Sequence, residues 1–451
     1  MEKISTLRHY GLFDAKVPRY TSYPPANRFQ QDVGARNQQD WLASVPPGEP
    51  VSVYVHIPFC RRLCWFCACR TQGTKTLAPV EGYVADLIAE IQAVAALLPK
   101  GVPMARLHLG GGTPTLLTQA LMEQLLEALF DAFERTEDFE FSVEIDPTEA
   151  APDLLEALAR WGMRRASIGV QDFNPTVQKA IGRPQSFEQT RLVADLLRAY
   201  GVGSLNVDLL YGLPHQSESS LLESLDRVIS LGPDRLALYG YAHVPHVSKR
   251  QVMIPMDDLP DAETRFQMSE RARERLLSLG FCALGIDHFA RPEDSLAKAA
   301  GAGHMRRNFQ GYTDDPCETL LGFGASAISK FRQGYSQNAV STAAYRQRVQ
   351  TSGRAGHKGY QMTPGDRATA ALIEALMCEG RVNVSKATAQ TPSLAADARG
   401  LTRNLLSKFP DILAGTEEEI VLRQEFGAAA RLIAADLDAS LMEHNIHSKA
   451  I

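Results

Sequence analysis

Four cysteines lie within ten residues, and they are the side chains of this sequence best suited to chemistry. Cys60, Cys64, Cys67 and Cys69 follow an apolar run over residues 51–57. Three thiolates on one short loop can bind three irons of a [4Fe–4S] cluster and leave the fourth iron without a protein ligand. Because an open iron can bind a small molecule, this spacing favours catalysis over simple electron transfer.

Clustered thiols have two other common uses. Structural zinc sites prefer Cys-x-x-Cys-type pairs, usually with a second pair further along the chain. Here Cys67 and Cys69 are separated by one residue, and Cys282, Cys317 and Cys378 stand singly. Disulfides form in oxidising compartments, and the N-terminus lacks the charged-then-apolar pattern of a secretion signal. Both alternatives are disfavoured, and a metal analysis separates zinc from iron.

The cysteine segment resembles a known family. Cys-x-x-x-Cys-x-x-Cys after a strand is similar to the signature of the radical S-adenosylmethionine (SAM) superfamily. The longer string over residues 54–69, Tyr-x-His-Ile-Pro-Phe-Cys-x-x-x-Cys-x-Phe-Cys-x-Cys, resembles the oxygen-independent coproporphyrinogen III oxidases. The resemblance implies that Cys60, Cys64 and Cys67 bind a [4Fe–4S] cluster, and it places Tyr54 and Phe66 beside SAM.

Composition sets the class of protein. The chain has 451 residues, of which 22% are charged and 45% hydrophobic, and its net charge is -5. These values are ordinary for a globular protein of two or three domains or one large barrel. They give no reason to expect a nucleic-acid partner, and no apolar run approaches the roughly 18 residues of a membrane span. We expect a cytoplasmic protein.

Short apolar strands alternate with amphipathic helical patterns between about residues 51 and 329. This alternation predicts an α/β fold with a parallel sheet, either a partial (β/α)6 barrel or a doubly wound sheet. Chemistry-bearing residues at the strand ends favour the barrel, and the resemblance implies an open-sided radical SAM barrel of six units. The expected strands are 51–57, 104–109, 139–145, 164–170, 204–211 and 235–241, and the expected helices are 83–98, 119–133, 151–161, 187–200, 217–231 and 262–279.

Three regions are expected. Residues 1–46 form an N-terminal arm, whose proline-bracketed segment 18–25 should be extended. Residues 47–330 form the barrel, and 331–451 form a mostly helical C-terminal domain with one short strand, 420–422, and no visible chemistry. The resemblance covers residues 17 to about 330 and fades beyond them. It implies that the arm is a lid, with Arg19 as a partner for a substrate carboxylate.

Polar and glycine residues follow the expected strands. Residues 110–112 are three glycines, which suit either a tight turn or close approach of the backbone to a ligand. Glu144 lies inside an apolar strand, where a carboxylate is costly without a partner. Asp146, Pro147 and Glu149 together predict the start of a helix. The resemblance implies SAM contacts by Gly111, Gly112, Thr113 and Glu144.

Asp208 also sits in an apolar strand, and a carboxylate there is expected to need a cation, whether its role is structural or functional. The resemblance implies that Gln171, Arg183 and Asp208 surround a second SAM. It further implies that Ala242 lines the first SAM and that Ile328 packs on its adenine.

The resemblance also implies a reaction. An electron from the cluster splits SAM, and the resulting 5′-deoxyadenosyl radical takes a hydrogen from two propionates of coproporphyrinogen III in turn. Each propionate loses carbon dioxide and becomes a vinyl group, giving protoporphyrinogen IX. Tyr54, Cys69 and Glu144 are the expected catalytic residues, and Cys69 is hypothesised to act without binding iron. We expect a monomer that takes electrons from a flavodoxin-type protein.

Two alternatives stay open at this stage. A haem-handling chaperone of the same superfamily would keep the three cluster cysteines, but such relatives typically lack the fourth cysteine and the N-terminal arm. A non-catalytic zinc or iron–sulfur binding protein would have no use for buried polar residues at strand ends. An anaerobic preparation that is brown, with about four irons per chain, would exclude the zinc protein.

Overall fold

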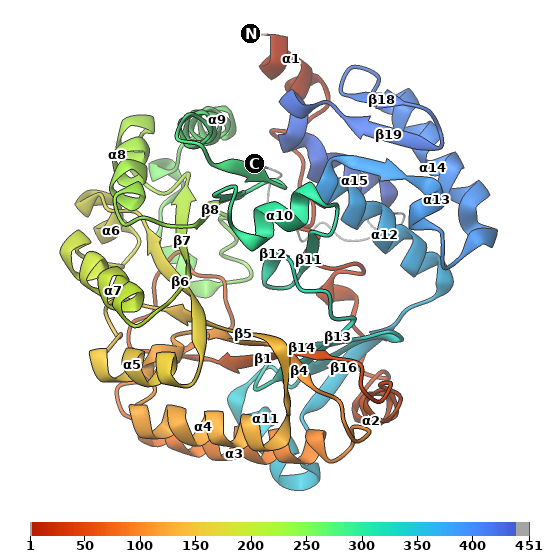
Figure 1. Cartoon of the computed structure of the whole chain (residues 1–451). Helices are drawn as coiled ribbons and strands as arrows, with labels where there is room; N and C mark the ends of the chain where they lie inside the picture. Colours follow the sequence, from red (N-terminus) through yellow and green to blue (C-terminus); the bar gives the residue numbers. More distant parts are fainter. Residues whose placement is uncertain (1, 439–450) are drawn as a thin grey trace.

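The computed structural model describes residues 2–438 and 451. Its centre is a twelve-stranded sheet in which six strands run parallel in the order of the chain (Figure 1). These six strands are β1 (Val51–Ile57), β4 (Met104–Gly111), β5 (Arg135–Ile145), β6 (Met163–Gln171), β7 (Ser204–Tyr211) and β8 (Arg235–Gly240). All six expected strands are confirmed.

Helices follow the parallel strands and cover the outer face of the curved sheet (Figure 1). The strand–helix alternation gives six βα units, so the predicted partial barrel is confirmed and the doubly wound alternative is wrong. The main helices are α3 (Ala78–Ala95), α4 (Gln119–Ala132), α5 (Pro152–Arg160), α7 (Phe187–Ala199), α8 (Glu218–Ile229) and α9 (Ala262–Ser278), with a short α6 (Pro175–Ala180) before α7.

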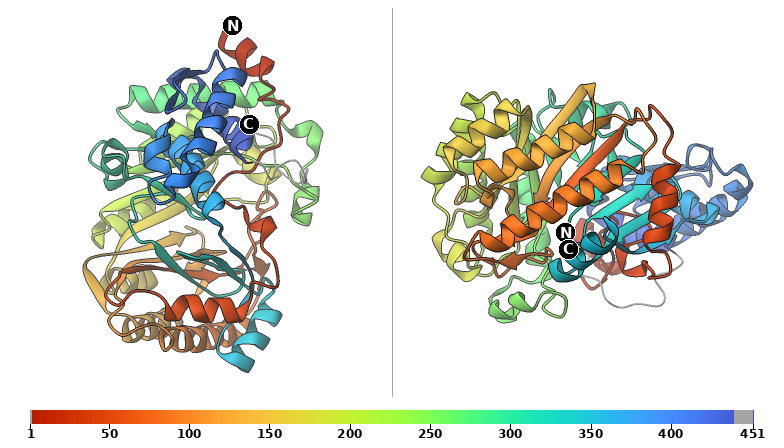
Figure 2. Two further views of the ribbon diagram at one scale, coloured as in Figure 1. Left: turned by 90° about the vertical axis from the view of Figure 1, so that its right-hand side faces the viewer. Right: turned by 90° about the horizontal axis from the view of Figure 1, so that it is seen from below.

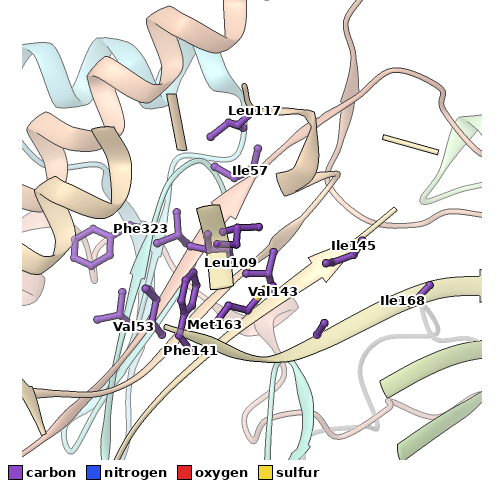
Figure 3. Close-up of a cluster of buried hydrophobic side chains, with 14 of the residues drawn as sticks. Val53, Ile57, Leu109, Leu117, Phe141, Val143, Ile145, Met163, Ile168 and Phe323 are labelled. Carbon is purple, nitrogen blue, oxygen red and sulfur yellow. The ribbon is translucent and has the colours of Figure 1, made fainter. Parts of the chain in front are cut away.

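Alternation along each strand separates a dry face from a polar one, because successive side chains point to opposite faces. Figure 3 shows the dry face, where Val53, Leu109, Val143 and other apolar side chains of neighbouring strands meet. The strand registers put the intervening residues side by side, with Tyr54 opposite His108. The polar residues therefore line the interior of the barrel.

The sheet does not close. At one edge β13 (Thr319–Phe323) runs parallel to β1, followed by antiparallel β14 (Ile328–Phe331), β15 (Gly334–Asn338) and β16 (Gly356–Gln361). At the other edge β10 (His288–Ala290) and β9 (Cys282–Leu284) pair antiparallel to β8. Since pairing continues to residue 361, we propose that the barrel domain extends to that point rather than to residue 330.

The C-terminal part is mostly helical, as predicted. It contains α12 (Pro364–Glu379), α13 (Val384–Ala387), α14 (Ala395–Lys408) and α15 (Ala430–Leu437). The expected strand 420–422 is β19 (Glu419–Leu422), and it pairs with two strands that the sequence did not reveal, β17 (Arg381–Asn383) and β18 (Leu413–Gly415).

The N-terminal arm begins with α1 (Glu2–His9) and runs along one side of the molecule (Figure 2). Its segment 18–25 is not helical, as predicted, but it is not extended throughout, because residues 21–24 bend and Tyr20 is left-handed (φ 48°). Leu7, Leu12 and Phe13 are buried in the same apolar core as α12 and α15. Further along, α2 (Ala35–Ala43) packs beside β16. Among the helices that the structure describes, none has the length and apolarity that a membrane crossing requires.

A buried carboxyl group lies where α3 meets the outer strands and α11 (Thr342–Ser352). Glu90 accepts hydrogen bonds from the Gly324 N–H at 2.8 Å, the Tyr345 hydroxyl at 2.8 Å and Asn338 Nδ2 at 2.7 Å. Burial outweighs these donors and raises the pKa of Glu90 from 4.5 to about 7. The folded protein therefore holds this proton more tightly than the unfolded chain.

Glu90 should make stability depend on pH. With a raised folded pKa, its contribution is fully present below about pH 4.5 and is lost as pH rises through about 7, at about 1.4 kcal/mol per pKa unit. We expect Glu90→Gln to remove the part of this loss of folding stability that arises from Glu90. The check is the difference in unfolding free energy between pH 6 and pH 8, which should be smaller in Glu90→Gln than in the original protein. An equal difference in both proteins would contradict the prediction.

Candidate active site

The cysteine loop follows β1 and is held by backbone pairing. β2 (Phe59–Cys60) pairs with β3 (Gln72–Gly73), and the Thr74 N–H donates to the Cys60 carbonyl at 3.0 Å. In the middle of the loop, the Trp65 N–H donates to the Ile181 carbonyl at 2.9 Å. The two ends of the loop are thereby joined to each other just after β1, and its centre is fixed to the β6–α7 connection.

The thiols lie close enough to perturb each other. Burial raises the pKa of Cys60 to about 11, and the other two predicted ligands, Cys67 and Cys64, add to the rise. Hydrogen bonding from Cys69 lowers the pKa of Cys67 to about 6, and the Cys69 N–H lies 3.4 Å from the Cys67 sulfur. Among the described residues, no group of three His, Cys, Asp or Glu side chains is arranged closely enough to hold a metal ion.

The donor set nevertheless fits an iron–sulfur cluster. Three thiols come from one loop, and Thr113 at the end of β4 is hydrogen-bonded to the Cys60 thiol. The guanidinium of Arg183 lies 3.4 Å from the Cys64 sulfur. A nearby cation and hydrogen-bond donors favour thiolates, the form in which cysteine binds metal. Cys60, Cys64 and Cys67 are therefore the residues that would hold the cluster.

Arg183 joins the cysteine loop to the ends of β5 and β6. It donates to the Gly169 carbonyl at 2.9 Å and forms an ion pair with Asp146 at 3.2 Å. Burial opposes its charge, but Asp146 and the Cys64 sulfur raise the pKa of Arg183 overall. Gln171 also lies against Gly169, in a left-handed conformation (φ 70°) that is rare outside glycine. Two of the residues predicted to bind a second SAM therefore lie together.

The predicted helix start at Asp146 is wrong. The structure has a turn at 147–149, and the next helix, α5, begins at Pro152. Asp146 accepts from the Thr148 N–H at 2.9 Å, which caps the turn, while its other oxygen pairs with Arg183. Glu149 lies 3.8 Å from Arg61 of the cysteine loop. Asp146 therefore caps a turn and pairs with a distant arginine, where the pattern predicted the first turn of a helix.

Glu144 faces the barrel interior, and it has the hydrogen-bond and ion-pair partners that a carboxylate in an apolar strand requires. The Gly111 N–H donates to its carboxylate at 2.9 Å, and His108 Nε2 lies 3.5 Å away. Burial alone would raise the pKa of Glu144, but His108 and the Gly111 N–H lower it overall, so the carboxylate is ionised. Tyr54 stacks on His108 with ring centroids 5.8 Å apart. Tyr54, His108 and Glu144 form one polar wall.

Asp208 faces the same interior, across a cavity of about 170 Å³ that Glu144 also lines. It accepts from Asn206 Nδ2 at 2.8 Å and from the Ser167 hydroxyl at 3.4 Å. Burial raises the pKa of Asp208 to about 6. No Lys, Arg or His side chain of residues 2–438 forms an ion pair with this carboxylate, so the cation expected for a structural role is not a protein group, and a cation bound in a functional role stays a prediction. Neutral donors take the place of a protein cation.

The glycines at the end of β4 are needed for packing whether or not SAM binds there. A Cβ on Gly112 would lie 2.6 Å from the Phe59 carbonyl oxygen, and one on Gly111 would lie 2.6 Å from the His56 ring. Gly110 and Gly111 are the last residues of β4, so Gly111 and Gly112 serve close packing on residues 56–59 rather than a tight turn, and the SAM contacts of Gly111, Gly112 and Thr113 stay predictions. The same holds for Phe66, which packs beside Trp65 and Tyr241, and for Ile328 in β14.

A second cavity, of about 1010 Å³, lies between the mouth of the barrel and the C-terminal domain. Ala242 lines it, and Gln251 Nε2 bridges the carbonyls of Ala242 and Phe66 at 3.1 and 2.7 Å. The cavity wall is thus joined directly to the cysteine loop. Its volume is at the upper end of the range for small-molecule sites.

Six arginines line this large cavity, namely Arg19, Arg265, Arg273, Arg307, Arg423 and Arg431. Backbone carbonyls hold three of them: Arg19 donates to Gly240, Arg265 to Tyr241 and Arg307 to Tyr20. None of these three forms a salt bridge with a carboxylate anywhere in residues 2–438. Burial and the neighbouring Arg19 lower the pKa of Arg431 to about 10, as expected where like charges gather.

Sequence reasoning missed Arg265 and Arg307. Arg265 lies on α9 within a run of charged residues that is typical of an exposed helix face, and no pattern in the sequence gives Arg307 a role. In each, one nitrogen is buried without a hydrogen-bond partner, Nε in Arg265 and Nη1 in Arg307. Only the folded arrangement reveals that these groups turn toward one cavity.

Comparison with known proteins places this site in a family. The chain matches the model of the Radical SAM superfamily over residues 54–228. It is 48% identical to the oxygen-independent coproporphyrinogen III oxidase of Paracoccus denitrificans over 100% of both chains. A protein of the same name from Cereibacter sphaeroides is 49% identical over 97% of each chain. The chain belongs to the oxygen-independent coproporphyrinogen III oxidases.

The fold of this oxidase agrees with a solved relative. The structure of coproporphyrinogen III oxidase from Escherichia coli, described as a radical SAM enzyme, aligns with a TM-score of 0.90 at 36% identity. The match covers 95% of this chain and 100% of that chain. Membership of the radical SAM superfamily identifies the cofactors as a [4Fe–4S] cluster and SAM. That two SAM molecules bind at once stays a prediction.

Proposed function

We propose that this oxidase converts coproporphyrinogen III into protoporphyrinogen IX without oxygen. Two propionate side chains each lose a hydrogen atom, carbon dioxide and one electron, and each becomes a vinyl group. The observation that carries the proposal is the arginine-lined cavity joined to the cysteine loop. A tetracarboxylate macrocycle requires a large site with cations, and this cavity has about 1010 Å³ and six arginines in its lining.

The cluster and SAM supply a radical that removes hydrogen. The protein's own residues bind and orient SAM and the substrate, and they enclose the site. Arg265 and Arg307 would receive propionate carboxylates, since a guanidinium already held by backbone carbonyls loses little freedom on binding. Glu144, ionised and fixed by the Gly111 N–H, would accept hydrogen bonds from SAM hydroxyl or amino groups. The large cavity thereby sets the position of the propionates relative to the cysteine loop.

The arm would act as a lid. Arg307 donates to the carbonyls of Arg19 and Tyr20, and Arg431 donates to those of Val17 and Pro18. These bonds hold the arm at the cavity, where it would keep water from a reactive radical. Arg19 itself lines the cavity, which supports the proposed contact with a substrate carboxylate.

The direct test is an anaerobic reaction of the iron-loaded oxidase with SAM, a reductant and coproporphyrinogen III. We expect protoporphyrinogen and 5′-deoxyadenosine to form together. SAM cleavage without decarboxylation would contradict the proposed substrate and favour the haem-handling relative.

Cys69 is the one thiol of the loop that the cluster does not need. It lies close enough to Tyr54 and Glu144 for their charges to interact with its own. We expect Cys69→Ser to keep full iron content and to lower the rate of product formation by at least about 10-fold, in the range seen for loss of a positioned proton-transfer group. Iron analysis and product assays measure the two effects. Loss of iron in Cys69→Ser would show instead that the thiol supports the cluster.

We also propose a reducing cellular compartment, because all seven cysteines of the chain are free thiols. The proposed oligomeric state is a monomer, and the proposed electron source is a flavodoxin-type protein.

A further inference from the structure

The exposed apolar side chains are concentrated near the cysteine loop. Of the eight large hydrophobic residues that are exposed in the described structure, four lie within residues 247–256 and a fifth, Leu63, is on the cysteine loop itself. Val252 is 72% exposed and Met256 is 73% exposed. Clustered apolar exposure of this kind marks an interaction site more often than scattered exposure does.

The segment that carries these side chains, residues 244–258, braces the outside of the cysteine loop. It includes two short helical turns, η3 (Lys249–Met253) and η4 (Met256–Asp258), and it projects from the body of the molecule (Figure 2). The Ser248 hydroxyl donates to the Cys67 carbonyl at 2.8 Å, and Arg250 donates to Thr71 at 2.9 Å. A protein bound to this segment would lie next to the loop that holds the cluster.

The charges around the loop are basic although the chain as a whole is acidic. Residues 58–75 carry Arg61, Arg62, Arg70 and Lys75 and no acidic residue, and Lys249 is exposed on the bracing segment. The whole chain has a net charge of -5. The acids nearest this surface are few: Glu149 faces Arg61, and Asp257 and Asp258 follow Met256. A partner with acidic residues around an apolar contact would be complementary.

We propose that this surface, made by segment 244–258 with the basic residues of the cysteine loop, docks a small acidic one-electron carrier protein. The inference rests on the proposed function, because each cleavage of SAM consumes one electron from outside. The carrier gives up one electron and is oxidised. That electron is used to break a C–S bond of SAM, which yields methionine and the 5′-deoxyadenosyl radical. Electron carriers bind through small, transient surfaces, which suits a patch of a few side chains.

The test compares two sources of electrons in the iron-loaded oxidase. Val252→Asp, Met253→Asp and Lys249→Glu are combined, because these three residues do not line the large cavity. Leu192→Asp with Lys100→Glu, exposed residues on the helical side, serves as the control. The rate of cluster reduction is followed by absorbance under anaerobic conditions with reduced flavodoxin or with dithionite. Binding of oxidised flavodoxin is titrated separately at low and high salt.

We expect the triple variant to be reduced by flavodoxin about 10-fold more slowly, in the range of electrostatic steering, and to bind flavodoxin more weakly at low salt. Reduction by dithionite and product formation with dithionite should not change. Equal flavodoxin rates in the variant and the control would overturn the proposal. A change in oligomeric state would also overturn it, because the surface would then contact a second copy of the chain. A raised KM for coproporphyrinogen III with dithionite would overturn it as well, because the surface would then belong to the lid.

This design separates the surface from the proposed function. If the original protein accepts electrons from flavodoxin but makes no protoporphyrinogen, the docking surface stands and the proposed reaction fails. If the original protein makes protoporphyrinogen with dithionite, but flavodoxin reduces the triple variant as fast as the control, the proposed reaction stands and the docking surface fails.

Discussion

Replacing Cys64 with Ser should abolish the iron–sulfur cluster and, with it, SAM cleavage. Removing a neighbour that only orients a metal ligand typically costs about 10- to 100-fold in metal affinity, and removing a ligand costs more. Cys60→Ser and Cys67→Ser should behave in the same way, because all three thiols serve one cluster. Iron content, the brown absorbance and 5′-deoxyadenosine formation measure the effect.

Cys282→Ser is the matched control. Cys282 is a free, partly buried thiol in β9, outside the cysteine loop. The variant should keep its iron and its SAM cleavage. If Cys64→Ser also kept the full cluster, the assignment of the three ligands would be wrong, and Cys69 would be the first candidate for the missing thiol.

Replacing Arg265 with Gln should weaken binding of the tetracarboxylate substrate by about 10- to 100-fold. A hydrogen bond to a charged group contributes roughly 1.5–3 kcal/mol, and about 1.4 kcal/mol is a factor of ten in affinity. Arg307→Gln should have a similar effect or a larger one, because Arg307 also holds the arm. The affinity for coproporphyrin III, followed by fluorescence in the iron-loaded protein, measures binding separately from turnover.

Arg271→Gln provides the comparison on the same helix. Arg271 is exposed on α9 and pairs with Glu274 at 3.0 Å, and it does not line the large cavity. Its loss should leave porphyrin affinity unchanged, and none of the three variants should alter iron content. Unchanged affinity in both Arg265→Gln and Arg307→Gln would place the macrocycle elsewhere.

Much of the barrel could be predicted from the sequence, because its signals are local. Each of the six parallel strands is a short apolar run, and each following helix repeats apolar residues at helical spacing. The cysteine spacing likewise identifies its own loop. The prediction failed where a distant residue competes for a local group, because Asp146 pairs with Arg183 and no helix starts there. The hydrogen bonds of Asp208 to Asn206 and Ser167 were not predicted either.

The arginine cavity could not be predicted for the same physical reason. Arg19, Arg265, Arg307 and Arg431 come from the arm, from α9, from β11 (Arg306–Asn308) and from α15, so no spacing in the sequence relates them. The outer strands β14 to β16 were also missed, since their antiparallel pairing depends on contact with β13 rather than on their own short patterns.

The shared core of the arm and the C-terminal domain couples the two mechanically. Leu7 and Leu12 have no exposed surface, and they share one core with Leu376 and Ile433 of the helical domain and with Phe266 of barrel helix α9. A macrocycle that enters between barrel and lid cannot displace the arm alone without exposing these side chains to water. Because Lys3 and Arg8 also pair with Glu270 and Glu263 of α9, the arm, the helical domain and α9 are held together as one packed unit.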